Sequence, residues 1–144
     1  YDVVFLNGKN NSSVNIEETI LKINSKIRIF NSNYEIKNLD KLDKNSNYLI
    51  FSGIGDPSSF KEILIENNIN VIKEKIFTDH YIYKTEDVKN IIEEAKKVNA
   101  KILTTEKDFV KLSDDVTGEI DYLKIELKIE EEQKFINFLN DKLN

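Results

Sequence analysis

The sequence predicts an α/β fold with a mostly parallel sheet and helices on both faces. Short continuous apolar runs, which are typical of parallel strands covered on both sides, occur at residues 3–6, 48–51 and 102–103. Segments with apolar residues at helical spacing lie between these runs. Strands that alternate with helices of this length favour parallel pairing.

Three further segments are weaker strand candidates. Residues 26–30 and 122–127 alternate between apolar and polar side chains, which indicates strands with one exposed face near a sheet edge. In the second of these, Leu123, Ile125 and Leu127 are predicted to share a face. Residues 71–77 are also predicted to form a strand. The Asn-rich residues 7–15 and 31–47 read as connections, the latter as a long loop or short hairpin, and no strong internal domain boundary is visible.

Four helices are predicted from apolar spacing. The clearest stripe comprises Val88, Ile91, Ile92, Ala95 and Val98. Thr85 is the predicted N-cap of this helix, since the acids that follow it suit a helix dipole. Asp56 before Pro57 predicts a second helix start. The other stripes are Ile16, Ile20 and Leu21; Phe60, Ile63 and Leu64; and Phe135, Phe138 and Leu139, the last in a helix that ends near Leu143.

Composition excludes several classes of protein. The 144 residues contain no Cys, so disulfides, thiolate metal sites and thiol nucleophiles are absent. A net charge of -5, with Lys and Arg spread among acids, argues against nucleic-acid binding. No apolar run approaches the length of a membrane span, and no signal peptide is visible. The chain begins at Tyr1 and enters a buried strand at once, which predicts a piece of a larger protein.

The first of three candidate segments, FSGIGDP, follows a buried strand and precedes a helix. Gly53 and Gly55 let the backbone turn sharply and approach a ligand or a neighbouring segment. The segment lacks the Lys-Ser/Thr ending of a P-loop and the third glycine of a dinucleotide fingerprint. A tight strand-to-helix turn is therefore the favoured interpretation, with anion binding at the helix N-terminus as the alternative.

The second candidate segment, FTDHYIY, contains His80, the single histidine of the sequence, directly after Asp79. It is predicted to be a loop at a strand end, where α/β proteins place their sites. An imidazole can take or share a proton near neutral pH, which makes His80 a catalytic candidate. A surface or packed histidine without a catalytic role is the alternative.

The third candidate segment, LTTEKD, follows another buried strand, so two hydroxyls and three charges come just past the core. Its residues are Thr104, Thr105, Glu106, Lys107 and Asp108. Thr105 can cap a turn that starts at Glu106, and Lys107 can pair with a phosphate or with Asp108. The alternative is a cap surrounded by solvated charges. One His and no Cys leave only carboxylates for a metal, so no metal site is predicted.

The order and spacing of FSGIGDPSSF, FTDHYIY and ILTTEKDFVKL are more specific than any one segment. Together they resemble the C-terminal half of the tetraacyldisaccharide 4'-kinases, the lipid A kinases of Gram-negative bacteria. Asp56 stands where that family often has Asn, and Tyr81 stands where many members have a second His. The resemblance is specific from about Tyr48 to Leu112. It is uninformative before that range and rests on a strand-helix ending after it.

The resemblance implies that residues 1–144 are the C-terminal lobe of a larger P-loop-kinase-type two-lobed protein. The implied activity is ATP-dependent phosphorylation of the 4'-hydroxyl of a lipid A disaccharide precursor, at the cytoplasmic face of the inner membrane. The family's phosphate-binding loop lies in the N-terminal half, and this sequence holds none. ATP and Mg²⁺ are therefore expected mainly on the missing N-terminal lobe, as is the membrane contact, and the fragment alone is expected to be inactive.

The resemblance also implies roles for the candidate residues. A family Asp in the missing half would act as base, paired with His80, while Asp79 would fix the loop or the imidazole ring. The segment from Thr104 to Asp108 would lie at the cleft edge and organise the site or the contact between lobes. Gly53 and Gly55 would allow close packing rather than hold phosphate.

Two other readings remain open at this point. One is a non-catalytic α/β module for binding or interaction that shares the same turn signals. The other is a receiver-like or nucleotide-binding domain, which is disfavoured because Leu6, Asn7 and Gly8 stand where an acidic cluster should end the first strand.

Overall fold

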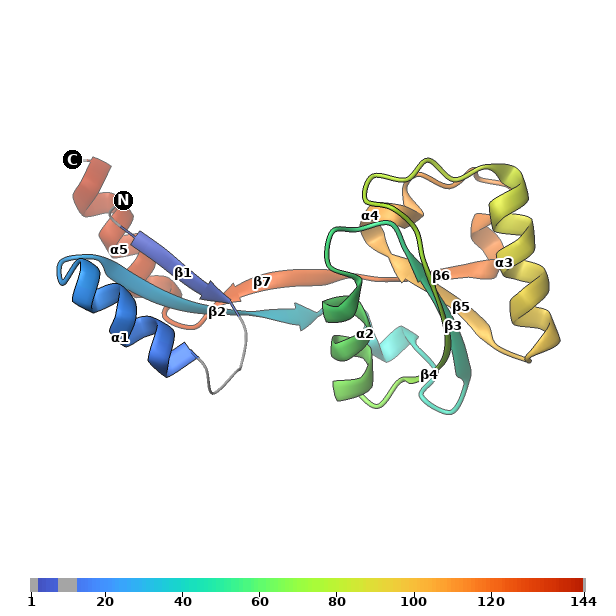
Figure 1. The fold of residues 1–144 in the computed structure, drawn as a ribbon, viewed down its shortest axis with the longest axis horizontal. Helices are drawn as coiled ribbons and strands as arrows, with labels where there is room; N and C mark the ends of the chain where they lie inside the picture. The colour runs from blue at the N-terminus through green and yellow to red at the C-terminus, as the bar shows by residue number, and fades with distance from the viewer. Residues whose placement is uncertain (1–2, 8–12, 144) are drawn as a thin grey trace. The chain divides into compact units, whose positions relative to one another are not determined.

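The chain divides into two compact units (Figure 1). The first contains residues 1–36 and 125–144, and the second contains residues 37–124. The computed structural model describes residues 3–7 and 13–143. No strong internal boundary was predicted from the sequence. The reason is that the chain passes between the units inside a predicted connection at residue 36 and inside a single predicted strand at residue 125, with no change in composition at either point.

The first unit carries a three-stranded sheet in the order β1-β2-β7. Its elements are β1 (Val3–Asn7), α1 (Ser13–Ile23), β2 (Arg28–Ile36), β7 (Ile125–Ile129) and α5 (Glu132–Leu143). β1 runs parallel to β2, and β7 runs antiparallel to it. Its core is aromatic: the Phe135 ring lies 4.9 Å from Phe5 and 5.3 Å from Phe30, centroid to centroid.

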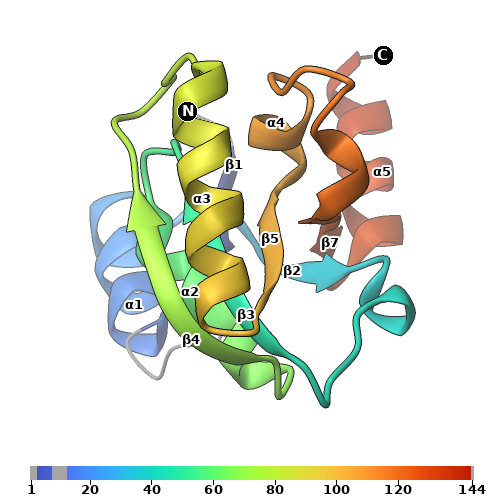
Figure 2. The ribbon, with the colours of Figure 1, turned by 90° about the vertical axis from the view of Figure 1, so that its right-hand side faces the viewer.

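The second unit carries a fully parallel four-stranded sheet in the order β4-β3-β5-β6. Its strands are β3 (Asn47–Ser52), β4 (Asn70–Ile76), β5 (Lys101–Thr105) and β6 (Ile120–Leu123). Its helices are α2 (Pro57–Glu66), α3 (Thr85–Lys97) and α4 (Glu106–Phe109), with 3₁₀ turns η1 (Leu39–Lys41) and η2 (Thr117–Glu119). α3 and α2 cover opposite faces of this sheet (Figure 2), so the predicted α/β architecture is confirmed here.

Burial explains why this sheet is parallel. Every residue from Tyr48 to Phe51 on the central strand β3 is almost wholly buried, as a strand covered on both faces must be. The α3 stripe packs on one face together with Leu49, Phe51 and Ile102. Val98 is wrong as a member of that stripe, because it is the C-cap residue and is 37% exposed.

The helix starts follow local hydrogen bonds. The Asp56 carboxylate accepts the Ser59 N–H (3.2 Å) and the Ser59 hydroxyl, and Pro57 is the first residue of α2, as predicted. The predicted N-cap of α3 is wrong by one residue. Lys84 is the N-cap, and its backbone N–H donates to the carboxylate of Asp87, an acid in the first turn, at 2.9 Å.

Two strand predictions are also wrong. Residues 31–36 are not a loop but the second half of β2, which pairs with β7 from Ser32 to Ile36. Residues 122–127 are not one strand, because Leu123 ends β6 in one sheet and Ile125 begins β7 in the other. Asn38 stabilises the break, since its side chain donates to Tyr122 O (2.7 Å) and accepts the Lys124 N–H (2.9 Å).

The remaining strand and helix predictions agree with the structure to within a few residues at each end. The predicted burial of residues 3–6 is wrong, because β1 is an edge strand and Phe5 is 39% exposed. The predicted connection at residues 7–15 lies largely outside the described residues, and α1 begins at Ser13 within it. Within residues 3–7 and 13–143, no helix has the length and apolar character that crossing a membrane requires.

Candidate functional site

The three candidate segments meet at one edge of the parallel sheet. They follow β3, β4 and β5, and the carboxyl ends of neighbouring parallel strands share an edge. Figure 2 shows α4 and the loop before α3 at that same end. The Phe77 N–H donates to Ser52 O (2.8 Å), and the His80 N–H donates to Gly53 O (3.2 Å), which ties the histidine loop to the end of β3.

Gly53 is the point of closest approach between segments. A Cβ at this position would lie 3.1 Å from Thr78 O, 3.1 Å from the Tyr83 hydroxyl and 3.2 Å from Tyr81 Cβ. A side chain there would displace the histidine loop, so Gly53 is required by packing against the chain itself. A Cβ at Gly55 would meet the Asp79 carboxylate, with Oδ2 at 3.7 Å and Cγ at 4.0 Å, which are ordinary contacts.

The His80 side chain is open to solvent, with 75% of it exposed. Its backbone has φ of 59°, the left-handed conformation that costs an ordinary residue roughly 1–2 kcal/mol. Two acceptors hold the His80 N–H in this conformation, Gly53 O and Asp79 Oδ1 (2.9 Å). The loop therefore fixes the backbone of His80 and leaves its ring accessible.

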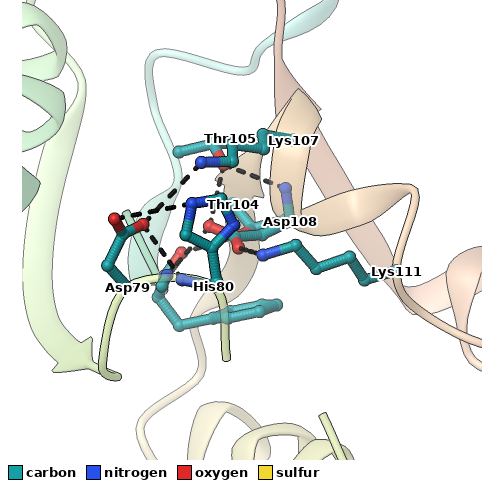
Figure 3. A network of polar contacts seen from close by, with 9 residues as sticks. Asp79, His80, Thr104, Thr105, Lys107, Asp108 and Lys111 are labelled. Atoms are coloured by element: carbon teal, nitrogen blue, oxygen red, sulfur yellow. Dashed lines mark hydrogen bonds and ion pairs between the residues drawn. The ribbon is translucent and has the colours of Figure 1, made fainter. Parts of the chain in front are cut away.

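Charges from two segments converge beside this ring (Figure 3). His80 Nε2 lies 3.7 Å from Asp79 Oδ2, and Lys107 Nζ lies 3.7 Å from Asp79 Oδ1. Asp79 thus stands between an imidazole from its own loop and an ammonium group from α4. The predicted pairing of Lys107 with Asp108 is not present; Asp108 pairs with Lys111 instead.

Asp108 is the most buried charged group of the site, with no exposed surface. Its Oδ2 accepts the Gly53 N–H (2.9 Å) and the Thr105 hydroxyl (2.8 Å), and its Oδ1 accepts Lys111 Nζ (2.8 Å). Burial acts to raise the pKa of Asp108, but the hydrogen bonds from Lys111, Gly53 and Thr105 outweigh it and hold the pKa below its usual value. Asp108 is therefore a buried carboxylate, ionised at neutral pH.

Aromatic rings pack together where the histidine loop meets the sheet. The Tyr83 ring lies 5.4 Å from Phe51 and 5.1 Å from Phe77, centroid to centroid. Burial, with the nearby Asp108 charge, raises the pKa of the Tyr83 hydroxyl far above its usual value. Lys111 Nζ lies 5.9 Å from the centre of the Tyr83 ring.

Sequence reasoning did not single out Tyr83 or Lys111. The weak signal for Lys111 was its position three residues after Asp108 in a predicted turn. No signal in the sequence pointed to Tyr83, because its proximity to Asp108 depends on the order of the strands.

The other candidates of the third segment have separate places. Thr104 is buried, and its hydroxyl donates to Phe51 O (2.7 Å), so it binds β5 to β3 rather than facing a cleft. Thr105 is the N-cap of α4, where its hydroxyl accepts the Asp108 N–H (3.1 Å) as predicted. Glu106 begins α4 and is half-buried. In the part of the chain that the structure describes, no three His, Asp or Glu side chains gather as a metal site would require.

Comparison with known proteins identifies the family of this chain. The family model described as "Tetraacyldisaccharide-1-P 4'-kinase" matches residues 1–144. The chain belongs to the tetraacyldisaccharide-1-P 4'-kinase family. The tetraacyldisaccharide 4'-kinase of Pelagibacter ubique is 42% identical to it over 139 residues, which cover 96% of this chain and 44% of that protein.

A second tetraacyldisaccharide 4'-kinase, from Rickettsia bellii, is 38% identical over 113 residues, which cover 78% of this chain and 33% of that protein. The chain thus spans less than half the length of these family members. The crystal structure of the "apo" form of LpxK from Aquifex aeolicus, in complex with ATP, aligns with a TM-score of 0.52 at 19% identity. The alignment covers 96% of this chain and 51% of that structure, and at this identity it shows a shared fold.

Proposed function

We propose that residues 1–144 are the C-terminal lobe of an ATP-dependent lipid kinase that phosphorylates the 4'-hydroxyl of the tetraacyldisaccharide 1-phosphate precursor of lipid A. The main support is the open His80 ring beside Asp79 and Lys107, in a chain of this family. Relatives bearing the name tetraacyldisaccharide 4'-kinase supply the substrate class, and the ATP-bound LpxK supplies the nucleotide.

The chain does not fit ATP and Mg²⁺ by itself. Its sequence has no Gly-rich loop ending in Gly-Lys-Ser/Thr, and its described residues gather no carboxylate group suited to a metal. We therefore assign most of the nucleotide and metal contacts to the part of the protein outside residues 1–144. On this proposal the 144-residue chain transfers no phosphate alone, and its own N-terminal lobe is its first partner.

His80 is proposed to manage the proton of the attacking hydroxyl. A sugar hydroxyl must lose a proton as it attacks a phosphoryl group, and a carboxylate supplied by the other lobe is the proposed base. An imidazole next to that carboxylate orients it and shares the proton. The exposed ring of His80 is free to meet such a partner, while Asp79 and Lys107 fix the charge around it.

The substrate places the whole enzyme at a membrane surface. Its acyl chains remain in a bilayer while its sugar hydroxyl enters the site, and lipid A precursors with ATP imply the cytoplasmic face of the inner membrane. Contact with the bilayer is assigned to the part of the protein outside this chain.

The test is turnover of the full-length enzyme with His80→Asn. Asn tolerates a left-handed backbone, so the loop keeps its shape while the titratable group is lost. Turnover should fall by about a hundredfold or more, the usual range for a proton-transfer group, with ATP affinity nearly unchanged. Steady-state phosphorylation of the lipid precursor and equilibrium ATP binding measure the two quantities.

Asn99→Ala is the matched control for backbone strain. Asn99 also has a positive φ (49°), but it lies between α3 and β5, at the opposite edge of the sheet. His80→Ala and Asn99→Ala should both lower the stability of the fold, because each places alanine at a positive φ. Only His80→Ala should abolish turnover. Full activity of His80→Asn would remove the imidazole from the mechanism and favour the alternative for residues 1–144, a non-catalytic α/β module for binding or interaction within the kinase.

A further inference from the structure

The backbone of Gly53 links a buried charge to the exposed histidine. Its N–H donates to Asp108 Oδ2 (2.9 Å), and its carbonyl oxygen accepts the His80 N–H (3.2 Å). These two polar groups flank a single Cα, so the chain of contact from Asp108 to His80 contains only one intervening residue. α4 and the histidine loop, which are far apart along the sequence, thereby share one anchor.

Asp108 is suited to be the fixed end of this link. A buried carboxylate is costly unless hydrogen bonds and an opposite charge compensate it. Three donors do so: the Gly53 N–H, the Thr105 hydroxyl and Lys111 Nζ. Thr105 also receives the Asp108 N–H, which holds the carboxylate against the start of α4. The group therefore has little freedom to move.

Gly53 is packed tightly against the histidine loop. Thr78 O and Tyr81 Cβ already stand within 3.2 Å of the place where a Cβ would be, and these residues flank His80 on both sides. Any shift of the Gly53 backbone is therefore passed to the loop. Beyond the loop, the Tyr81 hydroxyl donates to Asp87 (3.0 Å), which anchors its far side to α3.

We propose that Asp108 is a positioning residue for the phosphoryl transfer, acting on His80 through the backbone of Gly53. This inference rests on the proposed catalytic role of His80. It assigns to Asp108 neither contact with substrate nor a place in the proton path. The role of the buried charge is to hold the histidine loop in a fixed position at the edge of the sheet, so that the imidazole can meet its partner groups.

Asp108→Asn in the full-length enzyme tests the proposal. Asn has the same shape as Asp, but one of its two polar atoms is an NH₂ group that only donates. It therefore cannot accept all the hydrogen bonds that the carboxylate receives from Gly53, Thr105 and Lys111. The turnover number should fall by between about tenfold and about a hundredfold, because small misplacements of a reacting group are costly, while KM for ATP should change less than about twofold.

A double-mutant cycle separates positioning from simple destabilisation. If Asp108 acts through His80, then adding Asp108→Asn to the His80→Asn enzyme should lower turnover further by less than about twofold. An equal loss of turnover in both backgrounds would overturn the proposal and make Asp108 a stabilising residue only. Normal turnover of Asp108→Asn in the wild-type background would overturn it too.

Two further variants separate an effect on turnover from an effect on folding. Tyr48→Phe removes a buried hydroxyl that accepts the Asp43 N–H (3.0 Å) at the start of β3, away from the loop; it should lower the melting temperature without lowering turnover. If Asp108→Asn does not fold, Gly53→Ala tests the same link, because its Cβ presses directly on the loop. Gly53→Ala should lower turnover in the wild-type enzyme and add less than about twofold to His80→Asn; a full additional loss contradicts the proposal.

The outcomes also separate this inference from the proposed function. If His80→Asn leaves turnover unchanged, the role of the imidazole fails, and the link from Asp108 has nothing to position. If His80→Asn lowers turnover and Asp108→Asn does not, the kinase mechanism stands and the positioning role alone is refuted.

Discussion

Individual acidic side chains in this protein differ in role because their donors differ. Asp108 is buried among three donors, whereas Asp79 is half exposed between an imidazole and an ammonium group. Asp43 is a third case: it receives the Ser46 hydroxyl (2.6 Å), the Asn45 N–H (3.0 Å) and Lys101 Nζ (3.2 Å). These donors lower the pKa of Asp43 to about 2, led by the Ser46 hydroxyl.

Ser46→Ala should raise the pKa of Asp43 from about 2 toward its ordinary value of 3.8, because the largest single cause of the shift is removed. Since the folded pKa is depressed, the Asp43 interactions stabilise the fold above pH 3.8 and are lost as the pH falls toward 2. Carboxyl carbon chemical shifts followed by NMR from neutral pH downward measure the change.

Ser59→Ala is the control for this titration. The Ser59 hydroxyl is the leading cause of the lowered pKa of Asp56, so this variant should raise the pKa of Asp56 and leave that of Asp43 in place. An Asp43 titration that Ser46→Ala does not move would show that Lys101 or the backbone dominates instead.

The residues of the candidate site were predictable from the sequence only as far as their segments. Gly53 and Lys107 each follow a buried strand, His80 follows the more exposed strand β4, and parallel pairing brings these strand ends to one edge. The partners were not predictable. Lys107 reaches Asp79 and Asp108 reaches Gly53 because β3 lies between β4 and β5, and that order is not written in local pattern.

At the scale of helices and strands, burial decided which predictions were right. The continuous apolar runs of β3 and β5 and the stripe of α3 became the core of the second unit. The errors fell where buried and exposed side chains are mixed, at residues 31–36 and 122–127, because hydrophobic alternation there does not show which sheet a residue joins. The α3 start was misplaced by one residue because its first turn is held by the Asp87 carboxylate, which accepts the Lys84 N–H, and not by a hydroxyl at the N-cap.

The helix α2 offers a matched test of burial, since Leu64 is fully buried and Ile65 is 55% exposed. Leu64→Ala should lower the free energy of unfolding by about 2–5 kcal/mol, through lost apolar contact and the cavity left behind. Ile65→Ala should cost less than about 1 kcal/mol, because the side chain already meets water. Urea unfolding of each variant measures the difference; equal losses would mean that Leu64 is not part of the core.

At the scale of the whole chain, the two units differ in how much they bury. Among the described residues, Phe30 and Ser32 are the buried side chains of the first unit, and all the others belong to the second. The first unit relies on ring contacts around Phe30, whereas the second has an aliphatic and aromatic core on both faces of its sheet. The second unit is therefore expected to resist local unfolding more strongly than the first.

Amide hydrogen exchange should reveal this difference. β2 and β3 are both inner strands, so both have neighbours on each side, yet β3 should exchange more slowly by about a hundredfold because the core around it is larger. Exchange of the 144-residue chain followed by mass spectrometry measures both segments in one sample. Equal protection of the two strands would mean that the chain opens as a single cooperative unit.

The pairing of β2 with β7 has a consequence for biosynthesis. Ser32 faces Ile129 in this ladder, while residues 37–124, the entire second unit, lie between the two strands in the chain. During translation the second unit is complete before β7 emerges, and it can fold as an independent intermediate on the ribosome. β2 must wait with one edge unpaired until that synthesis is done, so the first unit is the last part of this chain to become native.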